Sequence, residues 1–152
     1  MAAIPTIPTI PTSPDIPGEV VIDCTVAAAW LLPDEPSSTA NRLLEAAPKT
    51  CFVLPVLFKL ELANVLCSAM RRNQVDPALL SQLAREVQAL PMRFESLALS
   101  FDALLAGAVH HDLAPDDYIY LEMAKRLNLP LATLDAKLAR SAKAAGVIVL
   151  TD

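Results

Sequence analysis

The sequence has few aromatic residues, no long uninterrupted apolar run and no sign of a leader segment. Phenylalanine, tryptophan and tyrosine make up 5% of the 152 residues while 54% are hydrophobic, so the core must be mainly aliphatic. The longest apolar stretch, residues 55–70, is interrupted by Lys59, Glu61 and Asn64 and falls short of the roughly 18 residues of a membrane-spanning helix. The N-terminus lacks the basic region and apolar core of a signal peptide. We therefore expect one globular cytoplasmic domain.

The sequence has too few cysteines and histidines, at unsuitable spacings, to suggest a disulfide framework or a metal site built from these residues. The three cysteines, Cys24, Cys51 and Cys67, are odd in number and show no CxxC spacing, which favours buried free thiols over disulfides or a zinc knuckle. The histidines, His110 and His111, are adjacent and so point in different directions on a helix or strand. A histidine-built metal site is disfavoured, and no local histidine could activate Cys24 as a nucleophile.

Positive charge is also scarce. The formal net charge is −5, whereas proteins with a large electrostatic footprint for nucleic acid usually carry a basic surplus. Locally basic stretches remain at residues 71–72, 125–126 and 137–143. Solvated helix faces have the same composition, so these stretches alone decide nothing about a binding cleft.

Proline is concentrated at the start of the chain. The first eighteen residues read MAAIPTIPTIPTSPDIPG, and their prolines remove backbone donors and disfavour both helices and interior strands. We expect residues 1–18 to form an extended or disordered flexible tail and residues 19–152 to form the folded domain.

Beyond this tail, short apolar runs alternate with helical patterns. We predict strands at residues 19–22, 51–54, 93–98, 131–134 and 147–150. We predict helices at residues 25–32, 37–47, 55–70, 77–89, 101–110, 116–127 and 136–145, with Pro55 and Pro77 each in a first turn, Asp76 as an N-cap and Gly146 after the last helix. The alternation predicts an α/β domain, a three-layer α/β/α arrangement with a central, mostly parallel sheet of four to five strands.

Acidic residues fall at corresponding places around this predicted sheet. Asp23 directly follows the first strand in VVIDCTVAAAW, and Asp135 directly follows LATL. Asp116 and Asp117 precede the helical segment YIYLEMAKRL, and Glu61 lies among apolar residues in the helix after the second strand. Because ligand chemistry in open parallel sheets gathers at the carboxyl ends of the strands, we expect these acids to converge on one edge.

The acids have two interpretations. Each aspartate could simply cap the helix that it precedes, and Glu61 could pair with an arginine. If the acids converge, however, their repulsion favours a divalent cation, and oxygen-only ligands suit Mg²⁺ or Mn²⁺. Such an ion can activate water and stabilise charge on a phosphoryl oxygen. Convergence would therefore indicate metal-assisted phosphodiester hydrolysis.

With these positions in order, the sequence from residue 20 to residue 150 resembles the PIN-domain nucleases and, within them, the VapC-type toxins of toxin-antitoxin pairs. The segments that carry the resemblance are VVIDCTVAAAWLLPDE, PVLFKLELANVL and DDYIYLEMAKRLNLPLATLDAKLARSAKAAGVIVL. The resemblance implies that the catalytic residues and ligands of Mg²⁺ or Mn²⁺ are Asp23, Glu61, Asp117 and Asp135. The residues implied to surround and orient them are Thr25, Asn64, Asp116 and Thr133, with Asp116 an alternative to Asp117 as the third ligand.

The same resemblance implies a biological role. It indicates a metal-dependent endoribonuclease that acts on RNA as a toxin, forms a homodimer and is blocked by a small antitoxin in its acidic groove. Two alternatives remain open. One is a binding module with the PIN fold and no catalysis, although none of the four acids is missing. The other is a phosphatase with Asp23 as nucleophile, although phosphatases of the haloacid-dehalogenase group carry DxD where this chain has Thr25.

Overall fold

A computed structural model describes residues 15–152 and contains one five-stranded sheet within them. The strands are β1 (Glu19–Ile22), β2 (Cys51–Pro55), β3 (Met92–Glu95), β4 (Leu131–Ala132) and β5 (Val149–Leu150). They lie in the order β3-β2-β1-β4-β5, and every adjacent pair is parallel. The predicted α/β class and parallel sheet are confirmed.

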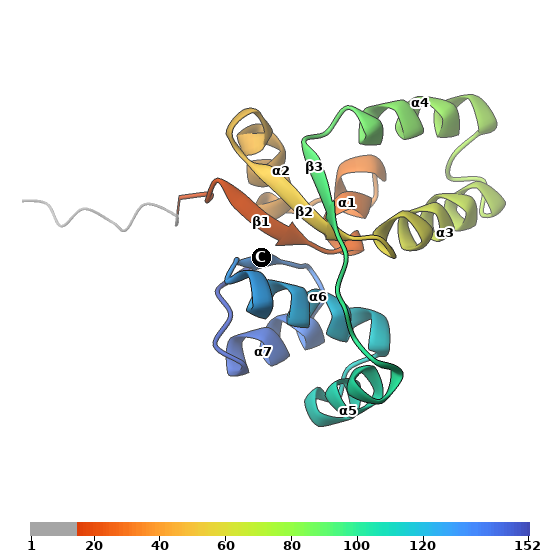
Figure 1. Cartoon of the computed structure of the whole chain (residues 1–152). Helices are drawn as coiled ribbons and strands as arrows, with labels where there is room; N and C mark the ends of the chain where they lie inside the picture. The colour runs from red at the N-terminus through yellow and green to blue at the C-terminus, as the bar shows by residue number, and fades with distance from the viewer. Residues whose placement is uncertain (1–14) are drawn as a thin grey trace, which may run out of the picture.

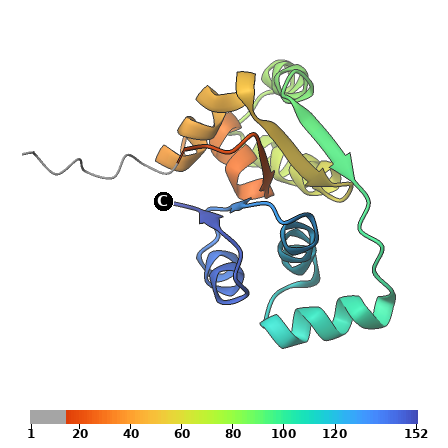
Figure 2. The same ribbon diagram turned by 60° about the vertical axis from the view of Figure 1, so that its left-hand side comes forward.

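Seven α-helices connect these strands in the described part of the chain. They are α1 (Cys24–Leu31), α2 (Ser38–Ala46), α3 (Phe58–Arg71), α4 (Pro77–Gln88), α5 (Phe101–His111), α6 (Pro115–Leu127) and α7 (Ala136–Ala144), with a short 3-10 turn at Ala47–Lys49. Figure 1 shows α1 to α4 grouped apart from α5 to α7, with the sheet between the two groups. Figure 2 shows α6 and α7 side by side beneath the sheet and α5 packed outside α6. The result is the expected three-layer arrangement.

The strand order determines where ligands can bind. The chain moves from β1 through β2 to β3 in one direction, then returns to the other side of β1 to add β4 and β5. Parallel crossovers are right-handed, so reversing direction moves the connecting helices to the opposite face. The reversal leaves a crevice at the carboxyl ends of β1 and β4, which is the usual ligand position in such sheets.

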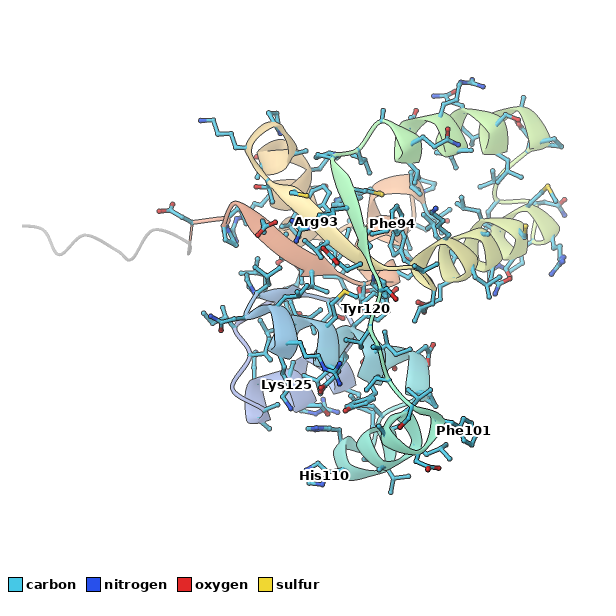
Figure 3. The ribbon with its side chains drawn as sticks, viewed as in Figure 1. Arg93, Phe94, Phe101, His110, Tyr120 and Lys125 are labelled. Carbon is cyan, nitrogen blue, oxygen red and sulfur yellow. The ribbon has the colours of Figure 1, made fainter. Side chains whose placement is uncertain are left out.

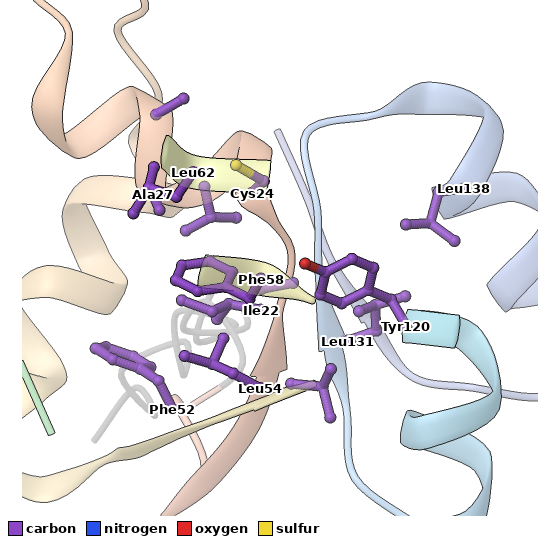
Figure 4. Close-up of a cluster of buried hydrophobic side chains, with 14 of the residues drawn as sticks. Ile22, Cys24, Ala27, Phe52, Leu54, Phe58, Leu62, Tyr120, Leu131 and Leu138 are labelled. Carbon is purple, nitrogen blue, oxygen red and sulfur yellow. The ribbon is translucent and has the colours of Figure 1, made fainter. Parts of the chain in front are cut away.

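The core is aliphatic, as the low aromatic content predicts. The central strand β1 places Val20, Val21 and Ile22 in full burial, because helices cover both faces of the sheet. Among the few buried aromatic side chains, Phe52 and Phe58 on one side and Tyr120 on the other enter this cluster from separate elements (Figure 4).

Several predicted boundaries are wrong. Pro55 is the last residue of β2, opposite Glu95 in β3, and does not open α3, which begins at Phe58. Proline lacks a backbone donor, and the end of a strand tolerates that loss as well as a first helical turn does. Helix α6 begins at Pro115 rather than at an aspartate, since the fixed φ of proline suits the first helical position. β3, β4 and β5 are also shorter than predicted.

Most of the predicted tail, residues 1–14, lies outside the described residues. The last residues of the predicted tail contact the domain. The carbonyl of Pro17 accepts a hydrogen bond from Thr50 Oγ1 at 3.1 Å, and the carbonyl of Gly18 accepts one from the amide of Cys51 at 2.8 Å. Within residues 15–152, every helix is too short or too polar to cross a membrane.

Candidate active site

Asp23 lies at the carboxyl end of β1, where the strand order reverses, and it is also the N-cap of α1. Its side chain is 3% exposed. Oδ1 accepts hydrogen bonds from the amides of Thr25 at 3.0 Å and Val26 at 3.4 Å. Asp23 therefore does cap α1, as the first interpretation holds, and these capping bonds use only Oδ1 of its two carboxylate oxygens.

Two threonine hydroxyls complete the surroundings of Asp23. Thr25 Oγ1 donates to Asp23 Oδ1 at 2.5 Å and accepts from the amide of Leu134 at 2.8 Å. Thr133 Oγ1 donates to Asp23 Oδ2 at 2.5 Å and accepts from the amide of Asp135 at 3.0 Å. These four hydrogen bonds tie the end of β1 to the segment after β4. They confirm the expected contact of Thr25 and place Thr133 against the same carboxylate.

Asp135 follows β4 on this segment and caps α7, since its Oδ1 accepts from the amide of Leu138 at 2.7 Å. A carboxylate has about four lone-pair positions. The capping bond of Asp135 and the single donor on Oδ2 of Asp23 leave oxygen positions on both residues that no described donor fills. Both acids can cap a helix and still accept a further ligand.

Glu61 reaches the same region from α3, where it is half-buried. Tyr120, which is completely buried in α6, donates its hydroxyl to Glu61 Oε1 at 2.6 Å. Burial raises the pKa of Glu61, the Tyr120 hydrogen bond opposes that rise, and the charges of Asp116, Asp117 and Asp23 add to it. Figures 3 and 4 show Tyr120 extending from α6 toward the central strands and α3.

Asp117 in the first turn of α6 is half-buried, whereas Asp116 is exposed. Burial is the main cause that raises the pKa of Asp117 to about 6, and the charges of Asp116, Asp135 and Asp23 raise it further against the opposing charge of Lys137. The pKa of Asp23 is also raised, chiefly by its burial, and its hydrogen bonds lower it in part. The structure thus brings Asp23, Glu61 and Asp117 within electrostatic reach of one another, and Asp135 within reach of Asp117.

This set of side chains fits a hard divalent cation by its chemistry. It consists of carboxylates, and the charges of neighbouring aspartates raise the pKa of both Glu61 and Asp117. The positive charge of Lys137 opposes the rise at Asp117, but its ammonium lies 3.1 Å from Asp112. Mg²⁺ and Mn²⁺ prefer such oxygen ligands, and Mg²⁺ commonly keeps several waters and binds through one or two carboxylates. Within residues 15–152, no three acidic, histidine or cysteine side chains are grouped tightly enough to enclose one ion by themselves. Water would have to complete any coordination shell.

Asn64 occupies a different place from the one expected. It lies on the exposed side of α3, lining a cavity next to Thr25, and none of its hydrogen bonds reaches an acid in the described residues. Sequence reasoning also missed Tyr120. The sequence did contain a signal for it, because Tyr120 is a rare aromatic hydroxyl on the apolar face of α6, three residues after Asp117. Its partner Glu61, however, lies 59 positions away in the sequence.

The fold and the acidic edge define the class of the protein. The family model described as "PIN domain" matches residues 20–144, which is most of the chain. The chain therefore belongs to the PIN-domain family, which is generally a family of nucleases. No curated protein matches it.

Solved structures show the same fold at low sequence identity. PAE2754 from Pyrobaculum aerophilum is 23% identical, with a TM-score of 0.66 over 87% of this chain and 83% of that one. FitAcB from Neisseria gonorrhoeae is 17% identical, with a TM-score of 0.61 over 86% of this chain and 96% of that one. VapBC2 from Rickettsia felis, solved bound to a DNA fragment from its promoter, is 11% identical, with a TM-score of 0.60 over 88% and 98%.

Proposed function

We propose that this protein is a Mg²⁺- or Mn²⁺-dependent endoribonuclease. The observation that supports the proposal most directly is the position of Asp23, Glu61 and Asp117 at the carboxyl edge of a parallel sheet, where the charge of Asp23 raises the pKa of both Glu61 and Asp117. A repulsive set of carboxylates is costly for a fold to maintain unless a cation binds there. Family membership supports the same class of chemistry.

Asp23, Glu61, Asp117 and Asp135 are the residues that would hold the ion, and Asp116 would add negative charge beside them. A bound Mg²⁺ or Mn²⁺ would supply an activated water and charge stabilisation at the phosphate. The protein's own contribution is orientation. Thr25 and Thr133 fix both oxygens of Asp23, and Tyr120 fixes Oε1 of Glu61.

The direct test is cleavage of a structured RNA by the purified protein with Mg²⁺, with Mn²⁺ and with EDTA. We expect cleavage that requires the ion and that Asp23→Asn abolishes while the circular-dichroism melt stays cooperative. Cleavage that persists in EDTA, or in the Asp23→Asn, Glu61→Gln double variant, would contradict a metal mechanism. Calorimetry that detects no millimolar Mn²⁺ binding would instead favour an inert binding module.

The biological role proposed is that of a toxin controlled by an antitoxin. The support is the fold shared with FitAcB and VapBC2 together with the resemblance of the sequence to VapC-type toxins. The partner would be a small protein that inserts a segment into the acidic groove. Co-expression with the product of the adjoining reading frame, followed by purification and an RNA-cleavage assay, tests this role: a stable and inactive complex is expected.

A homodimer is the assembly that the surface of α5 supports. Its exposed apolar side chains, Phe101, Leu105 and Val109, recur every four residues and are 74%, 44% and 80% exposed. Residues at this spacing lie on one side of a helix, and a contiguous exposed apolar patch is typical of interfaces. Figure 3 shows Phe101 projecting from α5 away from the rest of the domain. Light scattering of the wild type and of Val109→Asp would test it, with a monomer expected for the variant.

A further inference from the structure

The cavity that Asn64 lines adjoins the acidic site between α1 and α3. Its volume is about 430 Å³, and its lining residues are Cys24, Thr25, Ala28, Leu32, Glu35, Asn64, Val65, Ser68 and Arg72. Thr25 belongs to both places, because its hydroxyl also holds Asp23. The cavity therefore lies next to the edge where the proposed chemistry occurs.

The α3 wall of this cavity carries polar groups at helical spacing. Counting from Glu61, the lining residues Val65, Ser68 and Arg72 follow at 4, 7 and 11 positions, which places all of them on one side of the helix. The 11 positions from Glu61 to Arg72 correspond to about 16 Å along a helix axis. Arg72 thus lies far enough from the carboxylates to contact a phosphate other than the one being cleaved.

Arg72 has an uncommitted positive charge. Within residues 15–152 it takes part in no ion pair, and its Nε donates to the neutral Gln74 Oε1 at 3.2 Å. Asn64 on the same wall makes no hydrogen bond to another described side chain. Guanidinium and amide groups are donors suited to phosphate oxygens and ribose. The opposite wall has the aliphatic side chains of Ala28 and Leu32, against which the apolar face of a base can pack.

On the basis of the proposed ribonuclease function, we propose that this cavity binds the RNA strand beside the scissile phosphate and that Arg72 grips a neighbouring phosphate. Glu35 also lines the cavity and repels phosphate. The backbone of the strand therefore follows the α3 wall, and Glu35 accepts hydrogen bonds from ribose hydroxyls or base amino groups. Cations are scarce around the carboxylates, so a single arginine has a large share in holding the substrate.

The neighbouring Arg71 provides a matched control for Arg72, because Arg71 is exposed at the end of α3 but does not line the cavity. Binding of a labelled single-stranded RNA oligonucleotide of mixed sequence is measured by fluorescence anisotropy for the wild type, Arg72→Ala and Arg71→Ala. Ca²⁺ replaces Mg²⁺, and a gel checks that the RNA remains intact. The KM and kcat for cleavage are then measured with Mg²⁺.

We expect Arg72→Ala to weaken binding roughly tenfold, the size of effect seen when a hydrogen bond to a charged group is lost. The slope of log K against log salt should become less steep by about 0.7, the contribution of one phosphate contact to a single strand. KM should rise with little change in kcat, and Arg71→Ala should stay within about twofold of the wild type. Ser68→Asp, which places a negative charge on the same wall, should weaken binding as well.

Equal RNA affinity and salt dependence for the Arg71 and Arg72 variants, with a cleaving wild type, would overturn this inference and leave the proposed nuclease intact. An effect of Arg72→Ala on kcat with unchanged KM and binding would overturn it as well. A wild type that neither binds nor cleaves RNA under these conditions would overturn the proposed function itself.

Discussion

The hydroxyl of Thr133 donates a hydrogen bond to Oδ2 of Asp23 at 2.5 Å, although 110 positions separate the two residues in the sequence. The same hydroxyl accepts from the amide of Asp135. One side chain therefore joins two of the proposed metal ligands, one from the end of β1 and one from the segment after β4. The relative position of these acids depends on this bond.

Thr133→Val should weaken Mn²⁺ binding by about tenfold to a hundredfold, the range typical when a group that orients a ligand is lost. Valine keeps the shape but removes the donor to Asp23 and the acceptor for Asp135, both in a fully buried position. Calorimetric titration measures the affinity, and thermal unfolding should show a loss of about 1 to 3 kcal/mol. Thr133→Ser keeps the hydroxyl and should remain close to the wild type. Mn²⁺ affinity of Thr133→Val equal to that of the wild type would show that this hydrogen bond does not orient Asp23 for the ion.

Tyr120→Phe should lower Mn²⁺ affinity by about tenfold, because Glu61 loses the donor that fixes one of its oxygens. The loss should grow as the pH is lowered, since the Tyr120 hydrogen bond is what lowers the pKa of Glu61 against burial. The matched control is Tyr118→Phe, which removes a hydrogen bond to Glu122 on the same helix. Metal titrations at several pH values compare the two variants. If the control loses as much affinity as Tyr120→Phe, the specific role of Tyr120 is refuted.

Asp117→Asn should stabilise the metal-free protein at neutral pH. The pKa of Asp117 rises from its ordinary value of 3.8 to about 6 in the fold, so the folded state holds this proton more tightly than the unfolded state. Stability from this group is present below about pH 4 and is lost as the pH rises through about 6. After allowance for solvent screening the effect is on the order of 1 kcal/mol, or a Tm difference of roughly 3 °C.

Thermal melts in EDTA at acid and neutral pH measure this effect of Asp117→Asn. The variant and the wild type should converge near pH 4 and differ at neutral pH, and saturating Mg²⁺ should reverse their order. A variant that is less stable than the wild type at neutral pH in EDTA would disprove the repulsion inferred between the acids.

Gly107→Ala should destabilise the domain by about 1 to 3 kcal/mol, a common cost of overpacking. A Cβ at position 107 would lie 2.0 Å from the ring of Tyr118, which is 7% exposed and is also held by Glu122. Gly18→Ala is the control, because no atom lies within 4 Å of a Cβ added there. Urea unfolding of both variants gives the comparison. Equal stability would mean that α5 moves away from α6 at little cost.

The sequence was most informative where the signal was local. The segment VVIDCT placed Asp23 at a strand end and made it a possible helix cap, and its side chain does accept from the amides of Thr25 and Val26. A side chain there reaches the next amides regardless of the rest of the fold. Asp76 was predicted as an N-cap and Asp135 was considered as one for the same reason, and both are found as caps. Pro55 was assigned to the wrong element, since a strand end and a first helical turn both tolerate a missing donor.

What the sequence determined by itself is the α/β alternation, the parallel sheet and the four acids at strand and helix ends, because period, caps and chain order are properties of neighbouring residues. The tertiary structure alone decided which side chains meet. It joined Thr133 to Asp23 and Tyr120 to Glu61, turned Asn64 toward the cavity beside the acidic site and placed Arg72 in the wall of that cavity. Such contacts depend on the crossing of distant elements at the reversal between β1 and β4, a geometry that no short stretch of chain encodes.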